Sequence, residues 1–285
     1  MSKIDDHSRQ NPAYRPASIV KKGVFLDSIK GTIKKIIDKE KDDRTPGKVL
    51  YRAKMKYGNY VIKNGTYRGV EARLYEVDDV RESASYMGDR KYEPVFDYIK
   101  CFCRVLDENP ETRNILMIGG AGFQFPKYAI SRHPDVSMEV VEIEPLAVKI
   151  ARDYFYLDDL EEEFGAESSG RLKIVIDDGM NFLGETDGKY DIIINDAYHS
   201  DKPDSALSSP KGIMRIQRHM AVGGIYLFNL ITSIEGTYSM PLNMSFSLLN
   251  SLFADVKCLR CTPDIPDERL QNVVFCCKNE ADQKG

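Results

Sequence analysis

The stretch NILMIGGAGF, residues 114–123, decides the fold class of this chain. Its first five residues form a short apolar run typical of a buried strand, and the glycine-rich turn Gly119-Gly120-Ala121-Gly122 follows directly. A helical pattern begins after Phe125. Glycines between a strand and a helix let the backbone approach a ligand closely and point the helix N-terminus at it. The stretch therefore predicts the first strand, turn and helix of a nucleotide-binding α/β sheet.

The same alternation of strands and helices continues toward the C-terminus. Further buried strands are predicted at 138–141, 172–176, 192–194 and 225–228, with intervening helices at 145–155, 210–219 and 242–253. Short apolar strands separated by helices are typical of a parallel α/β sheet. The runs 256–261 and 272–277 have no helix between them, so we expect an antiparallel pair at the sheet edge. Residues 91–285 thus predict a Rossmann-like domain.

Two segments precede this domain. Residues 49–90 contain strand-like runs that end at Asp78-Asp79 and are followed by a linking segment. Asn64-Gly65 is a two-residue hairpin signal, so we expect a small antiparallel β module. Residues 1–48 form a polar tail and an amphipathic helix over 24–41, whose apolar stripe is Phe25, Ile29, Ile33, Ile36 and Ile37. Such a helix could lie on a membrane surface, but we favour packing against the body or a second subunit.

Composition limits the class of protein and its partners. The chain has 285 residues, 42% of them hydrophobic, and a net charge of −4. That charge argues against nucleic acid, which needs a basic surface, and suits small cationic substrates. No apolar run approaches the roughly 18 residues of a membrane-spanning helix, and the N-terminus lacks a secretory apolar region, so we expect a cytoplasmic protein without a membrane partner.

The six cysteines predict no metal site. Cys258 and Cys261 stand in a CxxC spacing, and Cys276 and Cys277 are adjacent in the sequence. Adjacent cysteines fit two ligands of one tetrahedral zinc site poorly. We interpret the cysteines as thiols in apolar strands of a protein from a reducing compartment.

Acidic residues follow the next three predicted strands. Glu142 ends the second strand, 22 residues after Gly120, where a carboxylate can accept both ribose hydroxyls of an adenosine ligand. Asp178 follows the third strand, and its carboxylate could accept a hydrogen bond from the exocyclic amine of adenine. A backbone N–H at or after Gly179 could donate to a ring nitrogen. Asp196 follows the fourth strand. Parallel sheets bind ligands at the carboxyl ends of their strands, so we expect these acids and Gly119, Gly120 and Gly122 to share one adenosine-binding site.

Simpler interpretations exist for the same residues. Glu142 could be a solvated strand end, and Asp196 could cap a helix N-terminus.

Residues 49–277 resemble the spermidine synthase (polyamine aminopropyltransferase) family, within the class I methyltransferase-like fold. The matching stretches are residues 118–122 (IGGAG), 141–144 (VEIE), 178–182 (DGMNF) and 190–196 (YDIIIND). The resemblance implies a transferase that moves an aminopropyl group from decarboxylated S-adenosylmethionine to an amine. It implies Asp196 as the catalytic residue and Tyr92 in the amine pocket. It also implies a homodimer, which the apolar stripe of residues 24–41 would suit.

The sequence departs from the family pattern at two acidic positions. The family's turn usually reads Gly-Gly-Gly-Asp-Gly, and Gly122 stands where that Asp would be. A second family acid, three residues after the catalytic one, is replaced by His199, which could serve as a base near neutral pH. Glu82, Asp89 or Asp201 could restore the charge. Two alternatives therefore stay open: a methyltransferase that uses intact S-adenosylmethionine on a small molecule, and a catalytically silent nucleoside-binding homologue.

Overall fold

The computed structural model describes residues 47–55, 58–199 and 202–279. These residues belong to one compact unit and contain a seven-stranded sheet, a four-stranded sheet and a two-stranded ribbon. The amphipathic helix expected over residues 24–41 lies outside the described residues.

The seven-stranded sheet has the strand order β12-β13-β11-β8-β5-β6-β7. Its strands are β5 (Asn114–Ile118), β6 (Ser137–Glu142), β7 (Leu172–Ile176), β8 (Tyr190–Asn195), β11 (Met220–Thr232), β12 (Asp255–Arg260) and β13 (Gln271–Lys278). β7, β6, β5, β8 and β11 pair in parallel, whereas β13 is antiparallel to both β11 and β12. The expected α/β sheet with a C-terminal antiparallel pair is confirmed.

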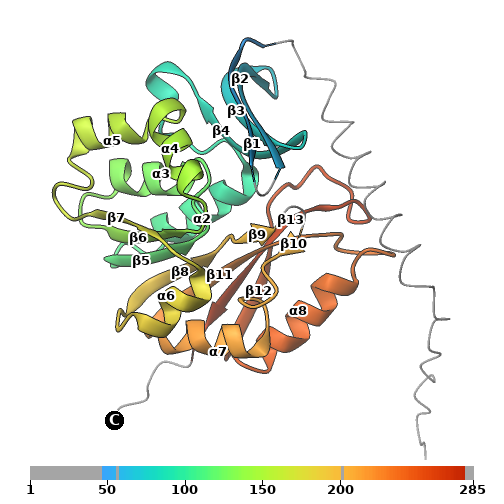
Figure 1. The fold of residues 1–285 in the computed structure, drawn as a ribbon. Helices are drawn as coiled ribbons and strands as arrows, with labels where there is room; N and C mark the ends of the chain where they lie inside the picture. The colour runs from blue at the N-terminus through green and yellow to red at the C-terminus, as the bar shows by residue number, and fades with distance from the viewer. Residues whose placement is uncertain (1–46, 56–57, 200–201, 280–285) are drawn as a thin grey trace, which may run out of the picture. The chain divides into compact units, whose positions relative to one another are not determined.

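Helices cover both faces of this sheet (Figure 1). One face carries α2 (Asp97–Asp107), α3 (Gln124–Arg132), α4 (Pro145–Tyr154) and α5 (Leu157–Phe164); the other carries α6 (Gly179–Glu185), α7 (Pro210–Arg218) and α8 (Met240–Asn250). Alternate residues of β5 enter different cores: Ile115 and Met117 pack into one, Leu116 and Ile118 into the other. Such double-sided burial explains the continuous apolar strands in the sequence.

The four-stranded sheet is the expected antiparallel β module, with its strands in sequence order. They are β1 (Val49–Met55), β2 (Gly58–Tyr67), β3 (Val70–Val77) and β4 (Val80–Tyr86), and a short 3-10 helix, η2 (Gly88–Arg90), follows.

Two expectations about this module were wrong. Asn64-Gly65 is not a hairpin turn: β2 runs straight through it, and the Asn64 side chain accepts a hydrogen bond from Arg73 Nε at 3.1 Å. The turns lie at Arg68-Gly69 and Asp78-Asp79, where both residues have positive φ, as a tight hairpin turn requires. The second turn leads into β4, which replaces the linking segment expected there.

β4 is fastened to α3 by buried polar side chains. The Gln124 side chain donates to Ser83 Oγ at 3.2 Å, and its carbonyl oxygen accepts the N–H groups of Val95 and Phe96. Lys127 Nζ donates to Ser85 Oγ and, at 2.7 Å, to the carbonyl oxygen of Phe155. The serines of β4 thus form a buried polar interface with α3, the helix that follows the glycine turn.

β4 also presses directly on the glycine turn. A Cβ atom placed on Gly122 would collide with Ser83 Oγ and would lie 2.7 Å from Ser83 Cβ. The collision is with the first atoms of a buried side chain, so rotation of the serine cannot relieve it.

We expect the substitution Gly122→Ala to lower the free energy of unfolding by about 1–3 kcal/mol, the usual cost of overpacking a core. Most of that loss should disappear in a Ser83→Gly background, because both colliding atoms are then removed. Urea denaturation of the two single variants and the double variant measures the coupling free energy. Simple additivity of the two effects would contradict the contact.

Candidate functional site

The glycine turn joins the tips of β5 and β8. Gly119 has φ of 95°, and a Cβ atom there would lie 2.5 Å from the carbonyl oxygen of Asp196. The Asp196 N–H donates to the carbonyl oxygen of Ile118 at 2.9 Å. Ala121 and Phe123 also have positive φ, of 40° and 54°. Left-handed backbone in non-glycine residues is uncommon and occurs often at functional sites, so this turn is a candidate binding element.

Glu142 closes over the same turn. One carboxylate oxygen, Oε2, accepts the N–H groups of Gly120 at 2.9 Å and Ala121 at 3.0 Å, and Oε1 accepts the N–H of Glu144 at 2.9 Å. The side chain is only 7% exposed, so it is not a solvated strand end. Glu142 and the glycines therefore lie together, as the sequence predicted.

Asp178 caps the N-terminus of α6. Its Oδ1 accepts the N–H groups of Met180 at 2.8 Å and Asn181 at 3.1 Å. A Cβ atom on Gly179, the first residue of α6, would lie 2.6 Å from Ile118 Cγ2, so this helix begins against the tip of β5. The expected adenine residue therefore has a structural task through Oδ1, while Oδ2 takes no part in those capping bonds.

Asp196 is half-buried and held by two neighbours. Asn229 Nδ2 donates to its Oδ1 at 2.8 Å, and the Tyr98 hydroxyl lies near the carboxylate. Asn272 Nδ2 donates to Asn229 Oδ1 at 3.0 Å, which fixes the orientation of the Asn229 amide. Burial raises the pKa of Asp196 to about 7, although Asn229 and Tyr98 both favour the ionised form. No helix begins here, because β9 (Tyr198–His199) follows, so Asp196 does not cap a helix.

A third carboxyl group, Glu82 of β4, joins Glu142 and Asp196. Burial, followed by the charges of Asp196 and Glu142, raises the pKa of Glu82 to about 8. The site therefore collects three acids from three elements, β4, β6 and the end of β8. Burial and the two neighbouring acids disfavour the ionised form of Glu82, and a cation beside it would favour that form.

Tyr92 lies away from these acids. Its ring packs edge-on against Phe164 of α5, with centroids 5.6 Å apart, and Lys91 Nζ lies 5.1 Å from the ring centroid. Its hydroxyl is buried without a hydrogen-bond partner among the described residues. None of these contacts reaches Asp196, and the tyrosine that does so is Tyr98.

His199 is placed only in part. Its backbone pairs with Lys202 of the strand β10 (Lys202–Pro203), whereas its side chain and Asp201 lie outside the described residues. Of the two described acids that could restore charge, Glu82 lies near Asp196, whereas Asp89 is exposed in η2.

Sequence reasoning missed two residues that hold Asp196. Asn229 belongs to the fifth parallel strand, β11, near its carboxyl end, and a polar residue at such a position is a signal for a ligand site that its interpretation as structural left aside. Tyr98 lies beside the apolar stripe of α2 and carries no such signal, because its contact with Asp196 depends on how α2 packs over the sheet.

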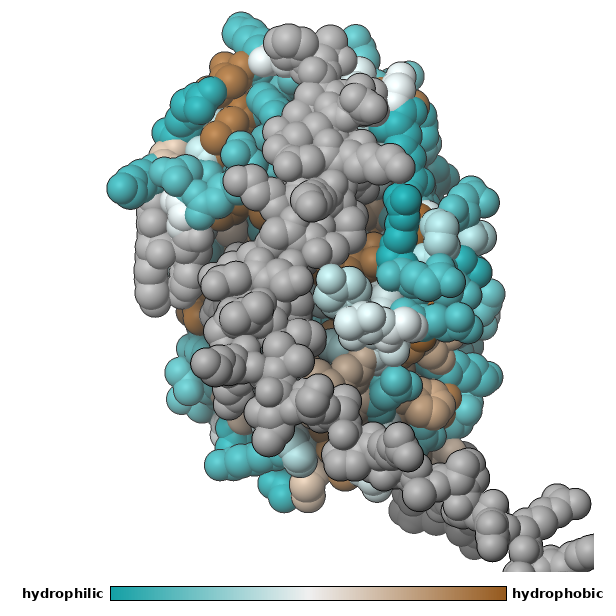
Figure 2. Space-filling view, turned by 90° about the vertical axis from the view of Figure 1, so that its right-hand side faces the viewer, coloured by the Kyte–Doolittle hydropathy of each residue, from teal (hydrophilic) through white to brown (hydrophobic). Residues whose placement is uncertain are grey.

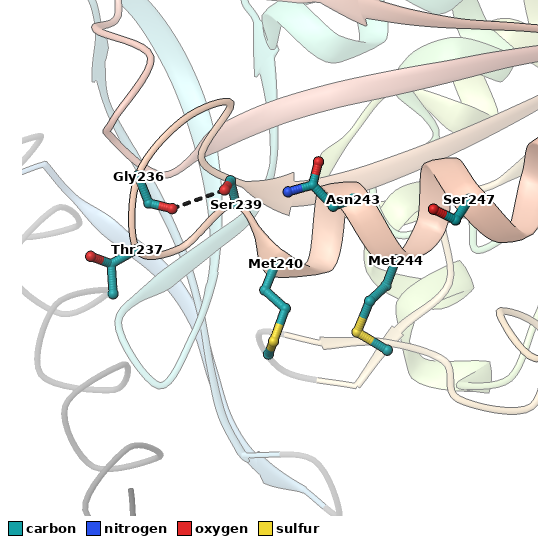
Figure 3. A pocket seen from close by; sticks show the side chains of 7 residues that line it. All are labelled: Gly236, Thr237, Ser239, Met240, Asn243, Met244 and Ser247. Atoms are coloured by element: carbon teal, nitrogen blue, oxygen red, sulfur yellow. Dashed lines mark hydrogen bonds between the residues drawn. The ribbon is translucent and has the colours of Figure 1, made fainter. Parts of the chain in front are cut away.

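A surface pocket of about 540 Å³ lies elsewhere, at the start of α8 (Figure 3). It is lined by Gly236, Thr237, Ser239, Met240, Asn243, Met244 and Ser247. These residues include no acid and none of the predicted site residues. The pocket therefore supplies none of the charge found around Asp196.

The described residues contain neither a helix that could span a membrane nor a cluster that could hold a metal ion. No helix among the described residues is long and apolar enough to cross a membrane. The coloured residues in Figure 2, which are those that the structure describes, are mostly hydrophilic, with hydrophobic residues scattered among them. Within the ranges given above, no cluster of three or more His, Cys, Asp or Glu residues could hold a metal ion.

Comparison with known proteins finds a matching family model and several similar proteins. The family model of the spermine/spermidine synthase domain matches residues 102–274. A polyamine aminopropyltransferase of Serratia proteamaculans is 28% identical over 180 residues, which are 63% of this chain and 58% of that protein. One of Yersinia pseudotuberculosis is 27% identical over 63% of this chain and 56% of its own length. The matched segment thus spans less than two thirds of these relatives.

Solved structures share the fold at low sequence identity. A probable spermidine synthase from Corynebacterium glutamicum is 17% identical, with a TM-score of 0.65 over 82% of this chain and 81% of its own. A spermidine synthase in complex with the transition-state analogue AdoDATO is 16% identical, with a TM-score of 0.61 over 82% and 74%. Human methyltransferase-like protein 13, in complex with SAH, is 20% identical, with a TM-score of 0.51 over 66% and 85%.

The raised pKa of Glu82 predicts a pH-dependent stability. At pH values between 4.5, the usual pKa, and about 8, the pKa in the folded chain, Glu82 is protonated in the folded chain and ionised in the unfolded chain. The stability contributed by that proton is complete below the lower value and lost as the pH rises through the upper one. Glu82→Gln mimics the protonated form, so it should raise Tm at pH 9 by a few degrees and change it little at pH 5.

Thermal unfolding at both pH values measures the effect. Glu71→Gln is the matched control, since Glu71 is an exposed residue of the same module and its variant should show no such pH dependence. A stability gain for Glu82→Gln that is equal at both pH values would show that Glu82 is not buried as a charge.

Proposed function

This chain belongs to the spermine/spermidine synthase domain family, and on that premise we propose that it transfers an aminopropyl group from decarboxylated S-adenosylmethionine to an amine. The observation that carries the proposal is the meeting of the glycine turn, Glu142 and Asp196 at the carboxyl edge of the parallel sheet. That edge is where sheets of this class bind nucleotides.

The chemistry requires an unprotonated amine next to a sulfonium. The amine nitrogen attacks the methylene carbon bonded to sulfur, the new N–C bond forms, and the C–S bond breaks to release methylthioadenosine as a neutral thioether. In water the amine is an ammonium with a pKa near that of lysine, about 10.4. Catalysis therefore needs a group that holds this cation and takes its proton as the nitrogen attacks.

Asp196 suits that task by its position and its restraints. Asn229 holds its carboxylate by a hydrogen bond, Tyr98 lies near it, and it remains partly accessible. Its pKa of about 7 lies close to the working pH, where a proton acceptor is most effective. Orientation of two bound reactants beside it would supply much of the remaining acceleration.

The donor would lie across the glycine turn. Glu142 would accept the ribose hydroxyls with its remaining lone pairs, and Asp178 Oδ2 would accept the adenine amine. The backbone of Gly119, Gly120 and Gly122, together with the N–H groups from Gly179, would line the nucleoside. Three carboxyl groups around the reacting centre favour the decarboxylated donor, because intact S-adenosylmethionine adds a carboxylate to an already negative site.

One observation favours methyl transfer as a second candidate. The turn carries no acid at Gly122, and Ser83 leaves no room for one. A methyltransferase that uses intact S-adenosylmethionine would gain from the lower negative charge at that point. Both reactions would use the same nucleoside site and differ in the carbon that is attacked.

A mass-spectrometric screen of amines with each donor separates the candidates. We expect methylthioadenosine and an amine heavier by one aminopropyl group from the decarboxylated donor, and no methylated product from intact S-adenosylmethionine. Methylated amine together with S-adenosylhomocysteine would establish the second candidate. No product and no nucleoside binding would contradict both.

Asp196→Asn tests the assigned proton acceptor in the same assay. We expect kcat to fall about 10²–10⁴-fold, the usual contribution of a general base, with the Kd for methylthioadenosine within about threefold of wild type. The amide keeps the size of the side chain, and its oxygen can still accept from Asn229 Nδ2. Loss of nucleoside binding would assign Asp196 to the donor site instead.

We also propose that the protein works in the cytoplasm as a homodimer. All six cysteines are free thiols, as expected in a reducing compartment. The apolar stripe that the sequence predicts over residues 24–41 suits a subunit contact.

Sedimentation of the full chain should show a dimer at micromolar concentration. A chain lacking residues 1–46 should form a weaker dimer, which dissociates into monomers at a higher protein concentration than the full chain does. A wild-type monomer would exclude this assembly.

A further inference from the structure

The donor of the proposed reaction carries an ammonium at the end of its aminopropyl chain, and the glycine turn offers that group no acid. Gly122 has no side chain, and the space where a side chain would begin is occupied by Ser83 of β4. A carboxylate that serves this ammonium must therefore come from another element.

β4 supplies one through a β-bulge. Ser83 pairs with Tyr75 and Arg81 pairs with Glu76, so two residues of β3 face three of β4 and Glu82 is the extra one. A bulge re-aims a side chain that regular alternation would send to the opposite face of the strand. Ser83 contacts the glycine turn, and its neighbour Glu82 also faces the site, with Asp196 and Glu142 as its strongest charged neighbours.

Glu82 reaches the site without a partner. It forms no hydrogen bond or ion pair with any residue in the described part of the chain, although it is only partly accessible to solvent. Other buried acids are paired: Glu76, in the same module, binds Lys63 Nζ at 2.7 Å, and Glu142 accepts three backbone N–H groups. A half-buried acid without a partner is neutralised by a proton, and a cation from outside the chain could take the place of that proton.

We propose that Glu82 binds the terminal ammonium of the donor's aminopropyl chain and so selects a decarboxylated donor. This inference rests on the proposed function. The donor is favoured over the acceptor amine because Glu82 lies next to Ser83, which touches the glycine turn, and close to Glu142, which bonds to that turn. An intact donor would bring its own carboxylate toward Glu82, and like charges at short range oppose its binding.

Three unreactive nucleosides separate the ammonium from the rest of the donor. Methylthioadenosine has no amino group, decarboxylated S-adenosylhomocysteine ends in an ammonium, and S-adenosylhomocysteine ends in an ammonium and a carboxylate. Titration calorimetry of the full chain should give the tightest binding for the decarboxylated compound. In Glu82→Gln that preference over methylthioadenosine should fall about tenfold or more, as expected when a hydrogen bond to a charged group is lost.

Two variants serve as controls. Glu71→Gln removes one negative charge from an exposed position of the same module and should keep the wild-type preference. Glu82→Asp keeps the charge on a shorter side chain and should lose only part of it. Methylthioadenosine should bind all variants within about twofold of wild type, which also reports that each variant is folded.

The outcomes distinguish failure of this inference from failure of the proposed function. An unchanged preference in Glu82→Gln, in a wild-type protein that does transfer aminopropyl groups, would overturn the role of Glu82 alone. A higher KM for the amine with unchanged nucleoside binding would place Glu82 in the acceptor site and equally overturn it. Wild-type protein that binds none of the three nucleosides would overturn the proposed function, and the inference with it.

Discussion

The site depends on how closely the tip of β5 approaches the tip of β8. Gly119 lies against the backbone of Asp196 with no room for a side chain, and the Asp196 N–H donates to Ile118 across the same gap. This contact sets the position of the Asp196 carboxylate relative to the turn that would hold the nucleoside. Any larger residue at Gly119 would push the two strand tips apart, and the required positive φ would be strained as well.

The acids of the site are kept at a cost in folding free energy. Glu82 and Asp196 both have raised pKa values, because burial removes water from their ionised forms and their neighbours do not fully compensate for that loss. Neutral residues of similar size would make this region more stable. The proposed cationic substrate accounts for these acids, because its binding would favour their ionised forms and return electrostatic free energy that folding gives up.

The β module contributes to the site as well as to the fold. Through Ser83, Ser85 and their partners Gln124 and Lys127, β4 packs against the helix that follows the glycine turn. The same strand excludes an acid from Gly122 and presents Glu82 by a bulge. The glycine turn thus lacks an acid at Gly122, and the neighbouring strand β4 supplies one at Glu82. Both features lie where β4 contacts the turn.

The sequence by itself determined the α/β class, the antiparallel edge pair and the elements that end in Gly119, Glu142 and Asp196. These are local properties, because apolar periodicity and glycine spacing act within a few residues. Only the tertiary structure decided that Tyr98 and Asn229 hold Asp196, that Tyr92 lies against α5, and that β4 exists as a buried strand. These outcomes depend on packing between elements far apart in the chain and on a bulge that shifts the register by one residue, and neither leaves a periodic trace in the sequence.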